Sequence, residues 1–263
     1  MDLQLNNKRA LVTGASRGLG FATAKLLSAE GAIVTINGRD DLHLQDAVRK
    51  ISDHSRNQVH GIAGDLSQPA FAEELVNSAS KVMGGLDILV CNAGGPPPGP
   101  FEAFDENAWQ KAIDLSFMSN VRLIKAALPM LRKSQVANVL TVTSYSVKQP
   151  IPNLILSNSI RAATIGLTKS LALELGKEGI RFNSILPAWT ETERVTNLMT
   201  SRAQSNGTTM EVEIAKQAAE SPLGRMSTPE EFAYAAVFLL SPLASYITGV
   251  MLAVDGGMLK GTF

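Results

Sequence analysis

Ser157 and Arg161 lie four residues apart in the stretch LILSNSIRAATIGLTKSLALEL. On a helix, this spacing places both side chains on one face. A serine hydroxyl can donate a hydrogen bond to a carbonyl oxygen, but at neutral pH it is a poor proton source without a partner base. An arginine stays charged, so Arg161 could hold an anionic group or stabilise charge developing on a carbonyl oxygen. The pair predicts a site that polarises a carbonyl and obtains its proton elsewhere.

A glycine-rich loop, TGASRGLG, spans residues 13–20 and follows an apolar run. Gly14 permits a tight turn, Gly18 lets the backbone approach a pyrophosphate, and Gly20 lets the next helix pack closely. The free N–H groups at the start of that helix attract phosphate. Glycines also mark ordinary turns, but the order strand, turn, helix favours a dinucleotide site. The predicted cofactor contacts here are Gly14, Ser16, Arg17, Gly18, Leu19 and Gly20.

The residues after the second apolar run indicate which dinucleotide would bind. NAD sites usually place a carboxylate there for the ribose hydroxyls, whereas this chain has Asn37-Gly38-Arg39. Arg17 lies in the glycine loop, and two guanidinium groups suit the oxygens of a 2′-phosphate. The sequence therefore favours NADP(H) over NAD(H). The alternative is that Arg39 only begins a solvated helix.

Seven short apolar runs, rich in β-branched residues, are predicted to be strands: 10–13, 32–37, 59–63, 86–91, 138–143, 180–186 and 250–254. They are continuous rather than alternating, as strands buried on both faces should be. Helical patterns such as 20–31 and 42–54 lie between them. This order predicts an α/β fold with a single Rossmann-type doubly wound parallel sheet and helices on both faces. No linker divides the chain, so residues 1–263 are expected to form one domain.

The polar segment 190–217 lacks a strand pattern. It is interpreted either as a mobile lid over the site or as a helical excursion on the surface. Four apolar residues in and near this region suggest a partly hydrophobic pocket, although core or lid packing explains them equally well: Leu154, Ile155, Trp189 and Met199.

Composition narrows the classes of partner. The chain has equal numbers of basic and acidic residues, which gives no basic excess for binding nucleic acid or a membrane surface. Its longest apolar run, 232–240, is too short to span a bilayer. Cys91 is the single cysteine, and no leader sequence is recognisable, so a reducing cytoplasm is expected. The histidines show no metal-ligand spacing, and no metal is expected; they are His43, His54 and His60.

The motifs in their order along the chain resemble those of the short-chain dehydrogenase/reductase family. The glycine loop is followed by GDLS (64–67), CNAGG (91–95) and ITGVMLAVDGG (247–257). The resemblance is closest to bacterial 3-oxoacyl-carrier-protein reductases and covers essentially the whole chain. It implies a nicotinamide cofactor, a small carbonyl or alcohol substrate, and a homotetramer or homodimer. The helical stretches 106–132 and 153–176 would be the assembly surfaces.

The resemblance also implies further cofactor contacts. Asp65 and Leu66 would meet the adenine ring, and Asn92 would lie along the cofactor. A proline-containing loop, PAWTET, would lie beside the nicotinamide, with Ala188 in place of the family's glycine. The remaining contacts implied in this way are Ala93, Gly94, Arg161, Pro187 and Thr192.

The family's catalytic tetrad of Asn, Ser, Tyr and Lys is mostly replaced. By the resemblance, Ser116 stands at the asparagine position, Ser144 keeps the serine, and Ser157 and Arg161 replace the tyrosine and lysine. A tyrosine can donate a proton because a nearby cation lowers its pKa. Tyr145, three residues before Lys148, is the one relocated acid that the sequence offers, although a loop role for it is favoured.

Two hypotheses follow. The first is an NADP(H)-dependent oxidoreductase with an atypical active site, whose arginine would suit an anionic substrate group. The second is a catalytically silent cofactor-binding subunit, which could pair with an active relative in a hetero-oligomer. The glycine loop and Ser144 favour the enzyme, and the three replaced positions favour the silent subunit. Since most members of the family are enzymes, the enzyme is favoured narrowly.

Overall fold

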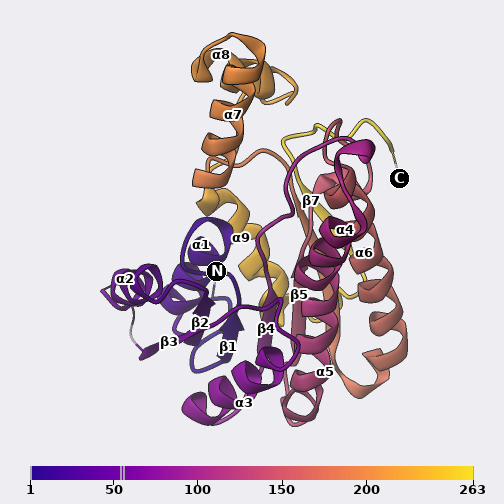
Figure 1. The fold of residues 1–263 in the computed structure, drawn as a ribbon. Coiled ribbons are helices and arrows are strands. Elements are labelled where there is room, and N and C mark those ends of the chain that lie inside the picture. Colours follow the sequence, from indigo (N-terminus) through magenta and orange to yellow (C-terminus); the bar gives the residue numbers. More distant parts are fainter. Residues whose placement is uncertain (1, 54, 56, 263) are drawn as a thin grey trace.

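The computed structural model describes residues 2–53, 55 and 57–262, and its centre is one parallel sheet in the order β3-β2-β1-β4-β5-β6-β7 (Figure 1). The predicted Rossmann-type sheet of about seven strands is therefore confirmed. Its strands are β1 (Arg9–Val12), β2 (Ile33–Gly38), β3 (Val59–Ala63), β4 (Ile88–Cys91), β5 (Asn138–Val142), β6 (Arg181–Pro187) and β7 (Met251–Val254). The inner strands are buried on both faces, because helices cover the sheet from both sides.

The helices form a layer on each face of the sheet. One layer contains α1 (Gly18–Ala29), α2 (Asp41–Ser52) and α9 (Pro229–Leu240). The other contains α3 (Phe71–Met83), α4 (Glu106–Ile113), α5 (Ser119–Leu131) and α6 (Ile155–Leu175). Within the described ranges, no helix has both the length and the apolar character that crossing a bilayer requires.

The direction of strand addition reverses at the neighbouring strands β1 and β4. In doubly wound sheets, ligands bind outside the carboxyl ends of the strands at such a switch point. The glycine loop follows β1, and Asn92 follows β4. The fold therefore brings two of the predicted cofactor motifs to the same edge of the sheet.

The predicted helix 106–132 is not a regular α-helix, because a π-helical turn, Asp114–Met118, separates α4 from α5. Side chains explain the wider turn. The Asn120 amide donates to the carbonyl of Ser116 at 2.9 Å, and the Thr164 hydroxyl of α6 donates to the same oxygen at 3.3 Å. Such insertions commonly occur at functional sites, and here the turn contains the position that the family resemblance assigns to asparagine.

The polar segment after β6 forms two helices, α7 (Glu193–Asn206) and α8 (Met210–Ala219), which stand clear of the sheet in Figure 1. We call residues 190–220 the lid. Its inner side packs on a separate apolar cluster that includes Trp189, Met199 and Met258. Met199 is fully buried and Trp189 is 8% exposed, so these two apolar side chains serve lid packing.

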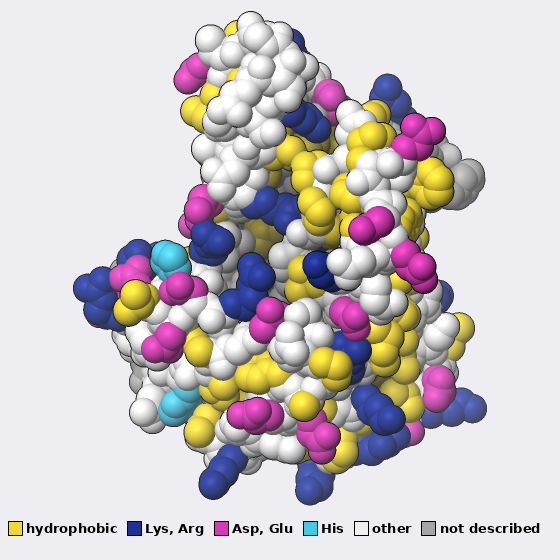
Figure 2. Space-filling view, in the orientation of Figure 1, with side chains coloured by type: hydrophobic (Ala, Val, Ile, Leu, Met, Phe, Trp, Pro, Cys, Tyr) yellow, Lys and Arg dark blue, Asp and Glu magenta, His cyan; other side chains and the backbone are white. Residues whose placement is uncertain are grey.

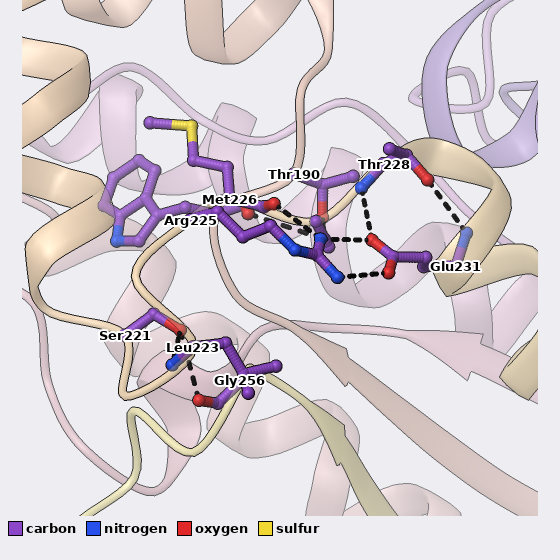
Figure 3. Close-up of polar contacts among 10 residues, drawn as sticks. Thr190, Ser221, Leu223, Arg225, Met226, Thr228, Glu231 and Gly256 are labelled. Carbon is purple, nitrogen blue, oxygen red and sulfur yellow. Dashed lines mark hydrogen bonds and ion pairs between the residues drawn. The ribbon is translucent and has the colours of Figure 1, made fainter.

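The first residue of the lid is tied to the segment that follows the lid, and that segment is tied to α9 (Figure 3). The hydroxyls of Thr190 and Ser227 are 2.8 Å apart, and the Arg225 guanidinium makes two bonds of 2.6 and 2.7 Å to Glu231. Thr228 and Glu231 form a reciprocal capping box that begins α9. The lid is therefore a helical insertion on a fixed stem.

At the opposite edge of the sheet, Asp87 ties the start of β1 to the start of β4. Its carboxylate accepts from the Arg9 backbone and guanidinium at 2.8–2.9 Å, and from the Ser134 hydroxyl at 2.6 Å. Burial would raise the pKa of Asp87, but the bonds from Arg9 and Ser134 outweigh it and lower the pKa below its usual value.

We expect Asp87→Ala to lower the free energy of unfolding by about 3 kcal/mol, because it leaves Arg9 without its buried partner. Glu178→Ala, which removes an exposed ion pair to Arg132, is the control. It should lower the free energy of unfolding by less than Asp87→Ala does. Urea unfolding measures both. Since the folded-state pKa of Asp87 is lowered, its contribution is complete above about pH 4 and is lost as the pH falls through that lowered pKa. If the wild type lost stability between pH 7 and pH 5 while the Asp87→Ala variant did not, this expectation would be contradicted.

Candidate active site

The glycine loop is held against the end of β4 by Asn92. The Asn92 amide donates to the carbonyl oxygens of Gly14 at 2.9 Å and Thr13 at 3.2 Å. Gly14 has φ +55°, and a Cβ on Gly20 would lie 2.5 Å from the Gly14 carbonyl oxygen. A side chain at either position would displace the loop, so both glycines are required by this packing.

The start of α1 is open to a phosphate. Arg17 precedes the helix, no side chain caps its first N–H groups, and its first turn has no acidic residue. These are the features of a helix N-terminus that binds an anion. The loop residues thus fit a dinucleotide pyrophosphate, and Gly18 and Leu19 lie partly exposed beside them. Ser16 packs against Gly38 at the end of β2.

The two arginines predicted for the 2′-phosphate have different surroundings. Arg39 is exposed directly after β2 and makes no hydrogen bond or ion pair to any described residue. Arg17 forms an ion pair of 2.7 Å with Glu193, the first residue of α7, and both side chains are more than half exposed. Arg39 is therefore free to bind a phosphate, whereas Arg17 must first break its ion pair with Glu193.

The residues expected near the adenine ring follow β3. The Asp65 carboxylate accepts from the Ser67 backbone at 2.9 Å. Leu66 is 5% exposed and its side chain packs in the core beside α3, so only its backbone could meet an adenine ring. After β4, Ala93 is partly buried, and the Cβ position of Gly94 faces open space.

The residues expected beside the nicotinamide end β6. Pro187 is buried and pairs with Val254, and the Ala188 backbone donates to the carbonyl of Val254 at 3.1 Å. Strand β7 therefore holds the loop at Ala188, where the family resemblance implies a glycine. Thr192 caps α7, with its side chain about 3.6 Å from the position of a Cβ on Gly18. The base of the lid therefore adjoins the glycine loop.

Arg161 is bound directly to the end of β5. Its Nη1 donates to the carbonyls of Val142 at 3.1 Å and Thr143 at 3.0 Å, immediately before Ser144. The Ser144 hydroxyl accepts from the Ser146 backbone at 3.1 Å, so its own O–H remains available as a donor. The structure thus brings the kept serine and the arginine together.

Burial lowers the pKa of Arg161 to about 10, and the charge of Arg194 contributes. That value is still far above neutral pH. Arg161 therefore supplies positive charge at pH 7 and does not act as a proton donor.

Ser157 lies one helical turn before Arg161 and is 8% exposed. Its hydroxyl makes no hydrogen bond among the described residues. The Ser116 hydroxyl is also buried without a partner among the described residues, and the Ser116 carbonyl accepts from the Thr164 hydroxyl of α6. The four tetrad positions are thus gathered around the first half of α6.

Tyr145 begins a short 3-10 helix, Tyr145–Val147, directly after Ser144. Its hydroxyl accepts from the Trp189 indole at 3.1 Å, and the side chain is buried in the cluster beneath α7. Burial raises the pKa of Tyr145, which makes it a weaker acid than free tyrosine. This environment favours the structural role over a relocated proton donor.

Two charged residues of the lid were not predicted from the sequence. Glu193 pairs with Arg17, and the Arg194 guanidinium donates to the carbonyls of Gly95 at 2.9 Å and Pro96 at 3.3 Å in the proline-rich loop. Exposed charges near a helix start carry no periodic signal. The available clue was Thr192 as the helix cap, which would have placed both residues in the first turn.

No three His, Cys, Asp or Glu side chains are gathered as in a metal site in the ranges 2–53, 55 and 57–262, which leave out His54. Cys91 is buried at the end of β4, and burial raises the pKa of its thiol. It is a core residue rather than a nucleophile.

Comparison with known proteins agrees with this arrangement. A family model described as enoyl-(acyl carrier protein) reductase matches residues 14–259. The 3-oxoacyl-[acyl-carrier-protein] reductase of Chlamydia muridarum is 33% identical over 258 residues, which cover 98% of this chain and 100% of the relative.

Solved structures extend the similarity to the fold. The L-sorbose reductase of Gluconobacter frateurii, complexed with NADPH and L-sorbose, superposes with a TM-score of 0.95 at 32% identity, covering 99% of this chain and 100% of that chain. A 7α-hydroxysteroid dehydrogenase complexed with NADH and 7-oxoglycochenodeoxycholic acid gives 0.89 at 28% identity, with 100% and 98% covered.

The parallel sheet, the glycine loop at its switch point and the α6 positions beside β5 agree with these matches along almost the whole chain. The chain therefore belongs to the short-chain dehydrogenase/reductase family of oxidoreductases.

Proposed function

We propose that the protein is an NADP(H)-dependent oxidoreductase that interconverts a carbonyl compound and its alcohol at an atypical active site. The observation that carries the proposal is the uncapped start of α1, set in the glycine cradle that Asn92 holds. The family membership supports the reaction class. The exposed Leu173 on α6 suits the dimer or tetramer that the resemblance implies.

Two observations support NADP(H). Arg39 is exposed beside the end of β2, where a 2′-phosphate would lie, and it pairs with no residue that the structure describes. The similar L-sorbose reductase is complexed with NADPH, although the similar hydroxysteroid dehydrogenase is complexed with NADH. The local charge favours NADP(H), because no carboxylate stands in this chain at the ribose position before Asp40. The residues proposed to hold the rest of the cofactor are Gly14, Ser16, Gly18, Leu19, Gly20, Asp65, Leu66, Asn92, Ala93, Gly94, Pro187 and Thr192.

When bound, NADPH supplies the hydride that reduces the carbonyl carbon. Ser144 donates its free O–H to the carbonyl oxygen, and Arg161 offers positive charge to the oxyanion. Ser157 adds an unpaired hydroxyl near the same oxygen. None of these three side chains releases a proton at neutral pH, so the proton that completes the alcohol comes from solvent. We infer slow reduction of simple ketones, because a positioned general acid normally contributes about 10²–10⁴-fold.

Cofactor binding should depend on the closeness of the glycine packing. We expect Gly20→Ala to raise the dissociation constant for NADPH about tenfold or more, since the added methyl displaces the Gly14 carbonyl. The same change at Gly166, an exposed α6 position with no atom within 4 Å of the added carbon, is the control. It should leave binding unchanged. Nicotinamide fluorescence titration measures both, and equal binding by the two variants would contradict the cradle.

Cofactor choice should depend on Arg39. We expect the protein to bind NADPH more tightly than NADH, and Arg39→Ala to weaken NADPH binding about tenfold while NADH binding is unchanged. Arg49→Ala, which removes an exposed arginine of α2 paired with Asp46, should change neither. The same titration serves, and NADH binding as tight as NADPH in the wild type would refute the assignment.

Restoring the missing acid should reveal whether the pocket is otherwise competent. We expect the double change Ser157→Tyr with Arg161→Lys to increase NADPH-dependent reduction of neutral ketones by about 10²–10⁴-fold. Ser157→Phe with Arg161→Lys fills the same space without a hydroxyl and is the matched control. Initial rates at saturating NADPH measure the effect, and thermal unfolding checks that both variants fold. Wild-type activity equal to that of the restored variant would show that the native site already has its own proton route.

A further inference from the structure

A second arginine, Arg194, stands near Arg161 at the active site. It lies in the first turn of α7 and reaches from the lid to the carbonyls of Gly95 and Pro96. The contact is close, because a Cβ on Gly95 would lie 2.3 Å from Arg194 Nη2. The carbonyls that bind Arg194 follow β4, and those that bind Arg161 end β5, which pairs directly with β4. The two guanidinium groups therefore lie at the same edge of the sheet, and the charge of Arg194 contributes to the lowered pKa of Arg161. The lid thus brings a second positive charge to the site.

Neither guanidinium has a carboxylate partner among the described residues. Within residues 2–53, 55 and 57–262, Arg161 bonds only to the carbonyls of Val142 and Thr143, and Arg194 only to those of Gly95 and Pro96. Two like charges held near each other are unfavourable, and an anion between them offsets that cost. In the space-filling view, Lys and Arg side chains gather in the hollow beneath α7 (Figure 2).

Both groups retain donors for such an anion. A guanidinium carries five N–H groups. The two bonds of Arg161 come from Nη1 alone, so its Nε and Nη2 donors remain. Arg194 uses one bond from each Nη. The remaining donors suit carboxylate oxygens, which arginine binds in pairs.

The position of Arg161 limits the length of the ligand. Arg161 is anchored to the carbonyl of Thr143, the residue before Ser144, and Ser144 is the donor proposed for the substrate carbonyl. An anionic group that reaches Arg161 while Ser144 binds the carbonyl therefore lies close to that carbonyl, as it does in a 2-oxo or 3-oxo acid. We propose that Arg161 and Arg194 together bind the carboxylate of a short oxo acid, and that Arg194 selects the acid over neutral ketones.

This inference rests on the proposed function, and two measurements separate their failures. Calorimetry on the NADPH-loaded protein would compare 2-oxobutanoate and 3-oxobutanoate with their methyl esters and with inorganic phosphate. Steady-state reduction of the same compounds gives KM and kcat. We expect at least one acid to bind and to have kcat/KM about tenfold or more above its ester.

Arg194→Gln should raise the dissociation constant and the KM of that acid about tenfold, with kcat and the ester little changed. Arg202→Gln is the matched control, because Arg202 lies on the same helix but packs over Trp189 and bonds to Gln217. Arg202→Gln should leave the dissociation constant, the KM and the kcat of the acid unchanged.

Esters that bind as well as the acids, phosphate that binds in preference to them, or an Arg194 variant with wild-type affinity for the acid would overturn the inference. Acid binding that is lost in the Arg194 variant, without reduction of any compound, would support the carboxylate site and reject the proposed oxidoreductase.

Discussion

The site depends on the hydrogen bonds that join α6 to the strand beside it. Arg161, Thr164 and Thr168 lie on one face of α6, at the spacing of successive turns. They bond respectively to the end of β5, to the carbonyl of Ser116 in the π-helical turn, and to the Thr141 hydroxyl at 3.0 Å. The Thr141 hydroxyl also bonds to Ser184 on β6. A buried polar stripe of this kind tolerates few alternative arrangements, because each unpaired group would cost free energy.

That docking would hold the proposed active site together despite the three positions at which the family resemblance implies a replacement. Arg161 retains a fixed place because main-chain carbonyls hold it, and main-chain carbonyls exist whatever the neighbouring side chains are. Ser144 is oriented by the backbone of Ser146. What the replacements change is the chemistry. The site keeps donors and positive charge for an oxyanion, and it lacks a side chain that releases a proton near neutral pH.

The cofactor side is organised independently, around Asn92. Its amide closes the glycine loop, and its backbone and the Thr13 hydroxyl exchange bonds of 2.8 and 2.9 Å. The lid contacts both the glycine loop and the proline-rich loop. Its Glu193 pairs with Arg17 of the glycine loop, and its Arg194 donates to the Gly95 carbonyl of the proline-rich loop. Its position is therefore coupled to the glycine loop and to the proline-rich loop at once.

The sequence by itself determined the sheet, because seven continuous apolar runs can be buried only between two layers of helices, and it determined the glycine loop, because the glycines act through local backbone geometry. It also placed Ser157 and Arg161 on one face of α6 by their spacing, and Ser144 at the end of the preceding strand. Only the tertiary structure decided what those side chains bind. The π-helical turn at Ser116 arises from Asn120 and from Thr164, the second of which is distant in sequence. Arg194 meets a loop almost a hundred residues away, and an exposed charge leaves no periodic trace of such a partner.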